Sequence, residues 1–378
     1  MRSAVILSIS LGLLAASCSG AGSTNEFGPD GSTSGDDGGG GGDGSAGGDG
    51  SSGGDGSTGR DGGGGNDGGG GGDGDGDGSA SDAAGNHDSG GGGDSGGSSA
   101  IKTVFLIMME NHNWSSIKGS ASAPYINGTL LSAGAHAENY FDNPSMVHPS
   151  EPNYIWLESG SNLGITTDSN PSVNHQSTTQ HLVTLLAAAN VPWRTYVEGI
   201  TGATCPLTAS GLYAPKHTPM LFFDDVVGNP PSTSNATCIA HVRPYTQLAT
   251  DLAGNSVARY NFITPNLCND MHNSTGCATT DAVKNGDTWL STEVPKILNS
   301  AAYQNGGAIF ITWDESEGGE FPIGMIVLSS KAKVGYAGSV RYYHSSMLRT
   351  VQEIFGVTPL LNDAANQPSL GDLFTSFP

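Results

Sequence analysis

The stretch KTVFLIMM at residues 102–109 decides the fold, and the polar pair Glu110 and Asn111 follows it directly. A continuous apolar run that ends abruptly in polar residues is typical of a strand buried on both faces. A second run, GAIFITW at residues 307–313, is followed in the same way by Asp314 and Glu315. Both runs therefore predict central strands with acidic side chains at their carboxyl ends.

Weaker strand and helix patterns occupy the rest of the C-terminal part of the chain. Strands are predicted at residues 194–197, 260–264 and 323–329, and helices at 152–158, 180–189, 287–300 and 345–355. Strands that alternate with helices predict an α/β fold, here a three-layer α/β/α sandwich with a mostly parallel central sheet. Such sheets bind ligands at the carboxyl ends of their strands, which is where Glu110 and Asp314 are expected.

The N-terminal part has a different organisation. Residues 1–18 have the layout of a bacterial secretory signal, with an apolar run at residues 4–14 and small residues up to Cys18. LAASC resembles a lipobox, which predicts lipidation of Cys18 and an exported lipoprotein at the cell surface or in the periplasm; ordinary signal cleavage would instead give a secreted protein. Residues 19–99 are almost entirely Gly, Ser and Asp, a composition that predicts a disordered tether before a folded domain at residues 101–378.

Most of the formal net charge of −22 belongs to this tether. The folded domain is only mildly acidic. Because nucleic-acid binding rests on a basic surface, the charge argues against a nucleic-acid partner.

Of the five cysteines, four remain for the folded domain once Cys18 is assigned to the lipid. An even number in an exported domain predicts two disulfides. We favour Cys205 with Cys238 and Cys268 with Cys277, because both pairs close short loops. Free buried thiols are the alternative, and a zinc site is disfavoured because the CxxC spacing is absent.

Four oxygen-bearing side chains at the two strand ends are candidate metal ligands: Glu110, Asn111, Asp314 and Glu315. Carboxylate and amide oxygens are typical ligands of divalent metal ions. One acidic pair alone would equally fit a helix cap or a loop salt bridge. Two pairs, each ending a strongly apolar strand, favour a site for one or two divalent metal ions of unknown identity.

Ser150 lies in HPSEPNY, residues 148–154, just before a short helical pattern. It is therefore expected at a helix N-terminus, where free N–H groups and the helix dipole favour a phosphate. A serine in this position is more often only an N-cap. A nucleophilic serine needs activation, which coordination to a metal ion would supply.

Further polar residues are candidates for proton transfer. Asp270 and His272 follow the strand at 260–264, and His344 opens the last long helix. Each could be an ordinary surface or core residue. As a group they suit a second metal ion or proton transfer.

Phosphate binding has its own candidates. Lys216 and His217 offer charge for a phosphate oxygen, although a solvated loop explains this segment equally well. The side-chain amide of Asn153 can donate to the same oxygens.

A series of motifs resembles one enzyme family. The motifs are FLIMMEN (105–111), HPSEPNY (148–154), YAPKHTP (213–219), FITPNLCNDMH (262–272), GDTWL (286–290), IFITWDE (309–315) and YYHSSMLRTVQEIFG (342–356). In this order they resemble the bacterial and fungal acid phosphatases of the phosphoesterase family. That family also contains the phosphatidylcholine-type phospholipases C and is related to the alkaline phosphatases, whose superfamily fold is implied for residues 101–378.

The resemblance implies roles for individual residues. Ser150 would attack phosphorus, with His272 and His344 as the other catalytic residues. The phosphate would be bound by Asn153, Lys216 and His217. The implied metal ligands are Glu110, Asn111, Ser150, Asp270, Asp314 and Glu315.

One departure from the family pattern bears on the reaction. The phospholipase branch continues ENRSFDH after its first strand, whereas Glu110 and Asn111 are followed here by HNWSS. This favours a phosphomonoesterase over a phospholipase C. Together with the signal sequence and the implied site, the expected protein is an exported, metal-dependent phosphomonoesterase that forms a phosphoserine. Its expected substrates are small-molecule or lipid phosphate esters such as phosphoinositides. A phospholipase C is the alternative, and a binding protein that keeps the fold without turnover is a third; the loss of site residues that would mark the latter is not seen.

Overall fold

The computed structural model describes residues 100–378 apart from Met146. The predicted signal sequence, the lipidation site Cys18 and the tether at residues 19–99 lie outside the described residues and stay predictions. Within the described residues no helix is both long and apolar enough to cross a membrane.

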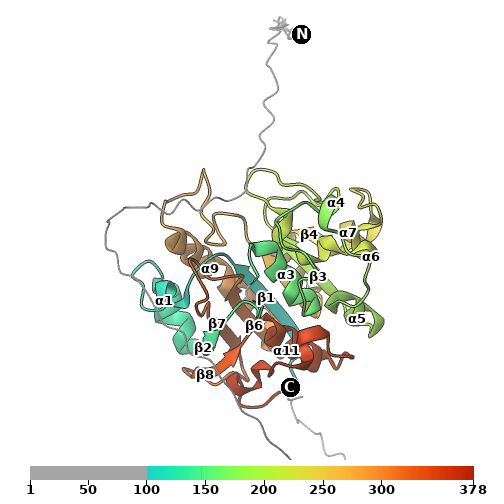
Figure 1. The fold of residues 1–378 in the computed structure, drawn as a ribbon. Helices are drawn as coiled ribbons and strands as arrows, with labels where there is room; N and C mark the ends of the chain where they lie inside the picture. The colour runs from blue at the N-terminus through green and yellow to red at the C-terminus, as the bar shows by residue number, and fades with distance from the viewer. Residues whose placement is uncertain (1–99, 146) are drawn as a thin grey trace, which may run out of the picture. The chain divides into compact units, whose positions relative to one another are not determined.

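The centre of the domain is one sheet with the strand order β4-β3-β5-β1-β6-β7-β2-β8 (Figure 1). The strands are β1 Thr103–Met109, β2 Ala135–Tyr140, β3 Trp193–Val197, β4 Val242–Pro244, β5 Tyr260–Thr264, β6 Gly307–Trp313, β7 Met325–Ser329 and β8 Ala337–Tyr342. Strand β7 runs antiparallel to both of its neighbours, and the other pairs are parallel. The predicted α/β class with a mostly parallel sheet is confirmed.

Helices cover the sheet on its two faces, which gives the predicted three layers. In one layer α11 packs against α3 and α5, and in the other α8 packs against α9 and α10. The α-helices are α1 Trp114–Ile117, α2 Leu131–Ala133, α3 Ser150–Ser159, α4 Pro171–Asn174, α5 Leu182–Ala188, α6 Asp224–Val227, α7 Ala236–His241, α8 Thr246–Ala253, α9 Ala282–Leu298, α10 Ala301–Gln304 and α11 His344–Phe355. Short helical turns of other types are η1 Ile126–Leu130, η2 Pro215–His217, η3 Pro219–Phe222, η4 Asn362–Ala365 and η5 Leu370–Leu373.

The two continuous apolar runs of the sequence form the central strands β1 and β6. Strands β5 and β6 have the predicted limits, and β1 begins one residue later than predicted. All residues of β6 are buried, as a strand covered on both faces requires. Three strands were not predicted: β2, β4 and β8. The first carries His, Glu and Asn, the second is very short, and the third is a largely exposed edge strand, so none shows an apolar run.

The strand register brings the two acidic pairs together. Strand β6 lies beside β1, with Met109 opposite Trp313 in the parallel ladder. The next residues, Glu110 and Asp314, are therefore neighbours at the same edge of the sheet. The ladder extends one step further, because the Asp314 N–H donates to the Met109 carbonyl at 3.0 Å.

Both favoured disulfides are present. Cys205 is bonded to Cys238, and Cys268 is bonded to Cys277. The second closes a loop with a sequence separation of only 9 residues, directly after β5. This loop carries Asp270 and His272, so the bridge restrains two of the predicted site residues.

Candidate active site

Three buried carboxyl groups lie at the carboxyl ends of the central strands. Glu110 and Asp314 are both 0% exposed, and Asp270, from the loop after β5, is 1% exposed. The Glu110 N–H donates to the Asp270 backbone carbonyl at 2.7 Å, which joins this loop to the end of β1. The structure thus brings together side chains from three segments that are far apart in the chain.

Burial and mutual repulsion raise the pKa values of these acids. Desolvation raises the pKa of Glu110 well above its usual value, and the charges of Asp314 and Asp270 raise it further. The pKa of Asp270 is also raised well above its usual value, first by desolvation. Desolvation, with the neighbouring charge of Glu315, raises the pKa of Asp314 to about 8. A bound cation would relieve this cost of holding several carboxylates in one buried place.

Asn111 contributes its backbone and its side chain to the same place. Its N–H donates to Asp314 Oδ1 at 2.9 Å. The residue has φ of 44°, the left-handed region that asparagine tolerates better than most side chains. Its side-chain oxygen Oδ1 is buried with no hydrogen-bond donor among the described residues, as expected of an oxygen placed to bind a cation.

Ser150 lies against this cluster. Its hydroxyl donates to Glu110 Oε2 at 3.3 Å, and a hydrogen bond from Ser150 also lowers the pKa of Asp314. Ser150 is the first residue of α3, and its preceding N-cap residue is Pro149, with no side-chain capping bond. The simple N-cap role considered for Ser150 is therefore not what this hydroxyl does.

The N-terminus of α3 differs from the expectation in one respect. Free N–H groups were expected there, but the Glu151 N–H already donates to Asp168 Oδ1 at 3.0 Å. The Lys216 ammonium donates to the other oxygen of the same carboxylate, Asp168 Oδ2, at 2.5 Å. Lys216 thus lies beside the start of α3, in an ion pair with Asp168. Its proposed contact with phosphate remains a prediction.

Asn153 is held in place by polar neighbours. Its amide donates to Glu315 Oε2 at 3.0 Å and to the Val147 carbonyl at 3.1 Å, and its side-chain oxygen accepts from Asn143. Asn153 therefore orients Glu315, and its donation to a phosphate oxygen remains a prediction.

His217 lies between two of the buried acids. Its Nε2 is 3.2 Å from Glu110 Oε1, and its Nδ1 is 3.5 Å from Asp270 Oδ2. Burial and the nearby charge of Lys216 hold the pKa of His217 well below its usual value, so the ring is neutral and able to bind a metal ion. Glu110, His217 and Asp270 together form a set with the spacing of metal ligands. His217 was predicted as a phosphate-binding residue, and whether it also holds a second ion was left open.

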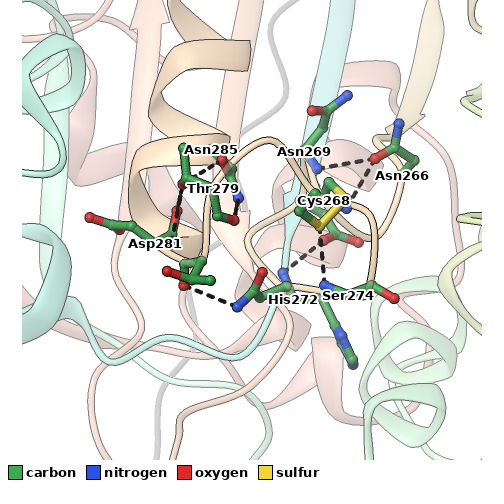
Figure 2. The surroundings of a disulfide bond; sticks show 12 residues. Asn266, Cys268, Asn269, His272, Ser274, Thr279, Asp281 and Asn285 are labelled. Atoms are coloured by element: carbon green, nitrogen blue, oxygen red, sulfur yellow. Dashed lines mark hydrogen bonds between the residues drawn. A yellow bond between two sulfur atoms is a disulfide. The ribbon is translucent and has the colours of Figure 1, made fainter.

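The loop after β5 presents His272 beside His217. The centres of the two rings lie 6.2 Å apart. The backbone N–H of His272 donates to Asp270 Oδ1 at 2.8 Å. Figure 2 shows Cys268 with Asn266 and Asn269 on one side and His272 and Ser274 on the other. Within this loop Asn266 Oδ1 accepts the N–H groups of residues 268 and 269. Hydrogen bonds and the disulfide together fix the position of His272.

Helix α9 packs against this loop through Gly286, which lies close to Met271. A Cβ atom on Gly286 would lie 2.3 Å from the Met271 side chain and 2.9 Å from that of Met109, so only glycine fits there. Three residues on, the Trp289 indole donates to Glu198, whose carboxylate accepts from the Asn266 N–H at 2.9 Å. The GDTWL motif thus positions the loop of Asp270.

His344 contacts the backbone of Asp314. Its Nε2 donates to the Asp314 carbonyl at 2.7 Å, and its Nδ1 accepts from the Tyr140 hydroxyl at 3.1 Å. Burial lowers the pKa of His344 to about 4, so the ring is neutral. With both nitrogens bonded, His344 positions Asp314 in this structure, and its role in proton transfer remains a prediction.

Several residues near the site were not identified from the sequence. The Tyr154 hydroxyl donates to Glu110 Oε1, and its ring stacks on His217 with centres 5.2 Å apart. His148 contacts Glu315, with Nδ1 2.7 Å from Oε2, and this hydrogen bond is the largest cause that raises the pKa of His148 to about 10. Both lie in HPSEPNY, so the signal was the motif itself, of which only Ser150 and Asn153 were assigned roles.

The residues at the strand ends fit a divalent metal ion. The set supplies carboxylates from Glu110, Asp314 and Glu315, the orphaned oxygen of Asn111 and the hydroxyl of Ser150, all of them hard oxygen donors. The pKa values of the buried acids are raised by desolvation although the charge of Lys216 opposes the shift at Glu110 and Asp270, so a cation bound among them would be stabilising.

A buried serine hydroxyl lies against carboxylates at the carboxyl ends of adjacent parallel strands, an arrangement that suits a nucleophile activated by a metal ion. The Phosphoesterase family model matches residues 122–358, more than half of the sequence, and the chain belongs to this family. The resemblance inferred from the motifs is thereby confirmed.

Individual relatives differ in how far they align. The phosphatidylinositol-3-phosphatase of Mycobacterium tuberculosis is 28% identical over 73% of this chain and 85% of its own length. A probable acid phosphatase of Kluyveromyces lactis is 26% identical over 58% of this chain, but over only 48% of its own length. Among solved structures, an alkaline phosphatase superfamily protein of Vibrio parahaemolyticus superposes with a TM-score of 0.46 at 11% identity, covering 72% of each chain.

Proposed function

We propose that this chain is an exported, metal-dependent phosphomonoesterase of the acid phosphatase type, with Ser150 as its nucleophile. The observation that carries the proposal is the Ser150 hydroxyl, 3.3 Å from Glu110 in a buried cluster of acids. A serine hydroxyl without activation is a weak nucleophile, and an adjacent base or a coordinated metal ion activates it.

The residues divide the reaction between them. The Ser150 Oγ attacks phosphorus in line with the ester oxygen, forming the Oγ–P bond as the P–O bond to the alcohol breaks. The hydroxyl proton passes to a neighbouring carboxylate, for which Glu110 is in reach. The departing alkoxide takes a proton from His272. Water then attacks the phosphoserine and gives a proton back to His272, and as the P–Oγ bond breaks the Ser150 oxygen regains its proton from Glu110. Glu110, Asn111, Asp314 and Glu315 would hold a divalent cation, which would supply positive charge for the phosphate oxygens and lower the pKa of the serine hydroxyl.

Other residues hold this arrangement. Tyr154 and His217 fix Glu110, Asn153 fixes Glu315, and His344 fixes the backbone of Asp314. Lys216, His217 and the amide of Asn153 are the candidate groups for the ester phosphate, which would have to displace present partners such as Asp168 and Glu315. Under this assignment His344 is a positioning residue rather than the proton donor.

The substrate class follows from the relatives and the predicted anchor. A relative named as a phosphatidylinositol-3-phosphatase supports phosphoinositides as substrates, and the fungal relatives named as acid phosphatases support soluble monoesters. A lipid on Cys18 would hold the domain near a membrane surface. We therefore propose a lipoprotein at the cell surface or in the periplasm, whose partners are the phosphate ester and the membrane, but not nucleic acid.

A substrate panel tests the proposal. Purified full-length chain is assayed with p-nitrophenyl phosphate, p-nitrophenyl phosphorylcholine and a short-chain phosphatidylinositol 3-phosphate, each with and without chelator. We expect hydrolysis of the two monoesters that chelator abolishes. Preferred cleavage of the phosphorylcholine diester would establish a phospholipase C instead, and activity that resists chelator would overturn the metal dependence.

A further inference from the structure

A second cluster of ligand-type side chains lies beside the site just described. Asp142 follows β2, His148 precedes α3, and Glu320 belongs to the loop between β6 and β7. One ligand atom of each residue lies within 4.8 Å of the others. The His148 Nε2 is 2.8 Å from Glu320 Oε1 and 3.8 Å from Asp142 Oδ2.

Asp142 is the unusual member, because it is buried and incompletely bonded. The residue is 1% exposed, and its Oδ1 accepts the Asn143 N–H at 2.7 Å. Its other oxygen, Oδ2, is buried, faces His148 Nε2 and has no hydrogen-bond donor among the described residues. The His148 ring at 3.8 Å is an ion-pair partner of this oxygen but too distant for a hydrogen bond. A buried carboxylate oxygen without a hydrogen bond is costly, and a cation bound directly to it would reduce the cost.

His148 is oriented as metal-binding histidines usually are. Its Nδ1 lies 2.7 Å from Glu315 Oε2. In the metal-free protein, hydrogen bonds to Glu315 and Glu320 raise the pKa of His148 to about 10, so an ion that binds Nε2 must displace its proton. Nδ1–H then donates to Glu315, and the lone pair of Nε2 is directed toward Asp142 and Glu320. A carboxylate that holds the far nitrogen of an imidazole fixes the tautomer and raises its basicity as a ligand.

We propose that Asp142, His148 and Glu320 bind a divalent transition metal ion, with Zn²⁺ as the best match. This site is separate from the candidate metal site formed by Glu110, Asn111, Ser150, Asp314 and Glu315, which we call the strand-end centre. One imidazole and two carboxylates suit Zn²⁺, whereas Mg²⁺ and Ca²⁺ prefer ligands made of oxygen alone. The side chains of His148 and Glu320 are 37% and 26% exposed, so one side of the ion stays open to water or to an anionic ligand.

The two sites are joined through one hydrogen bond. Glu315, a candidate ligand at the strand ends, is the residue that holds His148. An ion at the second site would add positive charge at the edge of the active site, where an anionic substrate must approach. The inference rests on the three side chains and does not require the proposed phosphatase activity.

Metal stoichiometry of the full-length chain tests the inference. The protein is stripped with chelator, titrated with ZnCl₂ by calorimetry, and its bound zinc is measured by elemental analysis after gel filtration. The main variant is Glu320→Gln, which changes a partly exposed side chain and is expected to fold; Asp142→Asn is the second. Glu317→Gln, in the same loop, is the matched control. We expect Glu320→Gln and Asp142→Asn each to lose one zinc equivalent, or to bind it at least tenfold more weakly, while Glu317→Gln matches the wild type.

Asp314→Asn distinguishes the two sites. It should lose the zinc of the strand-end centre and keep the zinc whose binding depends on Glu320. Loss in Asp314→Asn with no change in Glu320→Gln would overturn the second site, since the carboxylates would then hold only a protonated His148. Loss in Glu320→Gln with no change in Asp314→Asn would support the second site and count against the metal centre of the proposed function.

Discussion

The Ser150 hydroxyl donates to the Glu110 carboxylate at 3.3 Å, although the two residues are 40 positions apart in the chain. Glu110 directly follows the central strand β1, and Ser150 is the first residue of α3. The nucleophile and a candidate metal ligand therefore meet because a strand end and a helix start lie at the same edge of the sheet.

Replacing Ser150 with alanine should remove turnover and leave the fold intact. The variant lacks the oxygen that attacks phosphorus, and loss of a nucleophile typically costs at least about a thousandfold in kcat. Hydrolysis of p-nitrophenyl phosphate and thermal unfolding measure the two effects. Ser172→Ala, on an exposed residue of α4, is the matched control and should keep full activity. Full activity in Ser150→Ala would remove Ser150 from the mechanism.

The metal-free protein should lose stability as the pH rises from about 4 to about 8. Burial raises the pKa of Asp314 from 3.8 to about 8, so the folded state binds this proton more tightly than the unfolded state. The stabilising contribution is complete below the unfolded value and is lost as the pH passes through the folded value. Thermal unfolding in chelator at pH 5 and pH 8 measures it. In Asp314→Asn the pH dependence should be weaker, and an equal slope in the two proteins would contradict the assignment.

Tyr154→Phe should weaken metal binding at the strand-end centre by about 10- to 100-fold, which is the usual cost of removing a partner of a metal ligand. The lost hydroxyl donates to Glu110, a buried carboxylate that is then less well oriented. Calorimetric titration with Zn²⁺ measures the change. The control is Tyr196→Phe, the same substitution in β3, where the lost hydroxyl donates to Asp251 rather than to a candidate metal ligand. This variant should keep the zinc affinity of the wild type. A similar loss of affinity in both variants would indicate a general effect on folding.

His181→Gln should destabilise the protein at pH 6 by on the order of 3 kcal/mol and much less above pH 9. The His181 ring is buried between Glu158 and Asp225, at 3.0 Å from each, and these acids raise its pKa to about 9. For a histidine with a raised pKa the stabilisation is complete below about 6.5 and is lost as the pH rises through 9. Chemical unfolding at both pH values measures the difference.

A control for the histidine is His241→Gln, because the His241 ring stacks on Trp193 and its substitution removes a ring contact. That variant should lose a similar amount of stability at both pH values. A pH-independent loss in His181→Gln would show that packing, rather than charge, is what His181 contributes.

Local sequence patterns were sufficient where one physical requirement dominates. Strands β5 and β6 have the predicted limits because strands buried on both faces need continuous apolar runs. Strand β2 escaped prediction because its polar side chains serve contacts such as the pair between His136 and Glu138. The contacts of His344 with Tyr140 and the Asp314 carbonyl likewise had no local signal, since their partners are far apart in the chain.

By itself the sequence determined the fold class, the two strands that are followed by acids and the motifs of the Phosphoesterase family. These features depend on the order and spacing of residues along the chain, which a single sequence displays directly. Only the tertiary structure decided that His217 lies between Glu110 and Asp270, that Asn153 holds Glu315, and that His148 faces Asp142 and Glu320. Such contacts are decided by strand register, helix packing and burial, which act between segments that are distant in sequence.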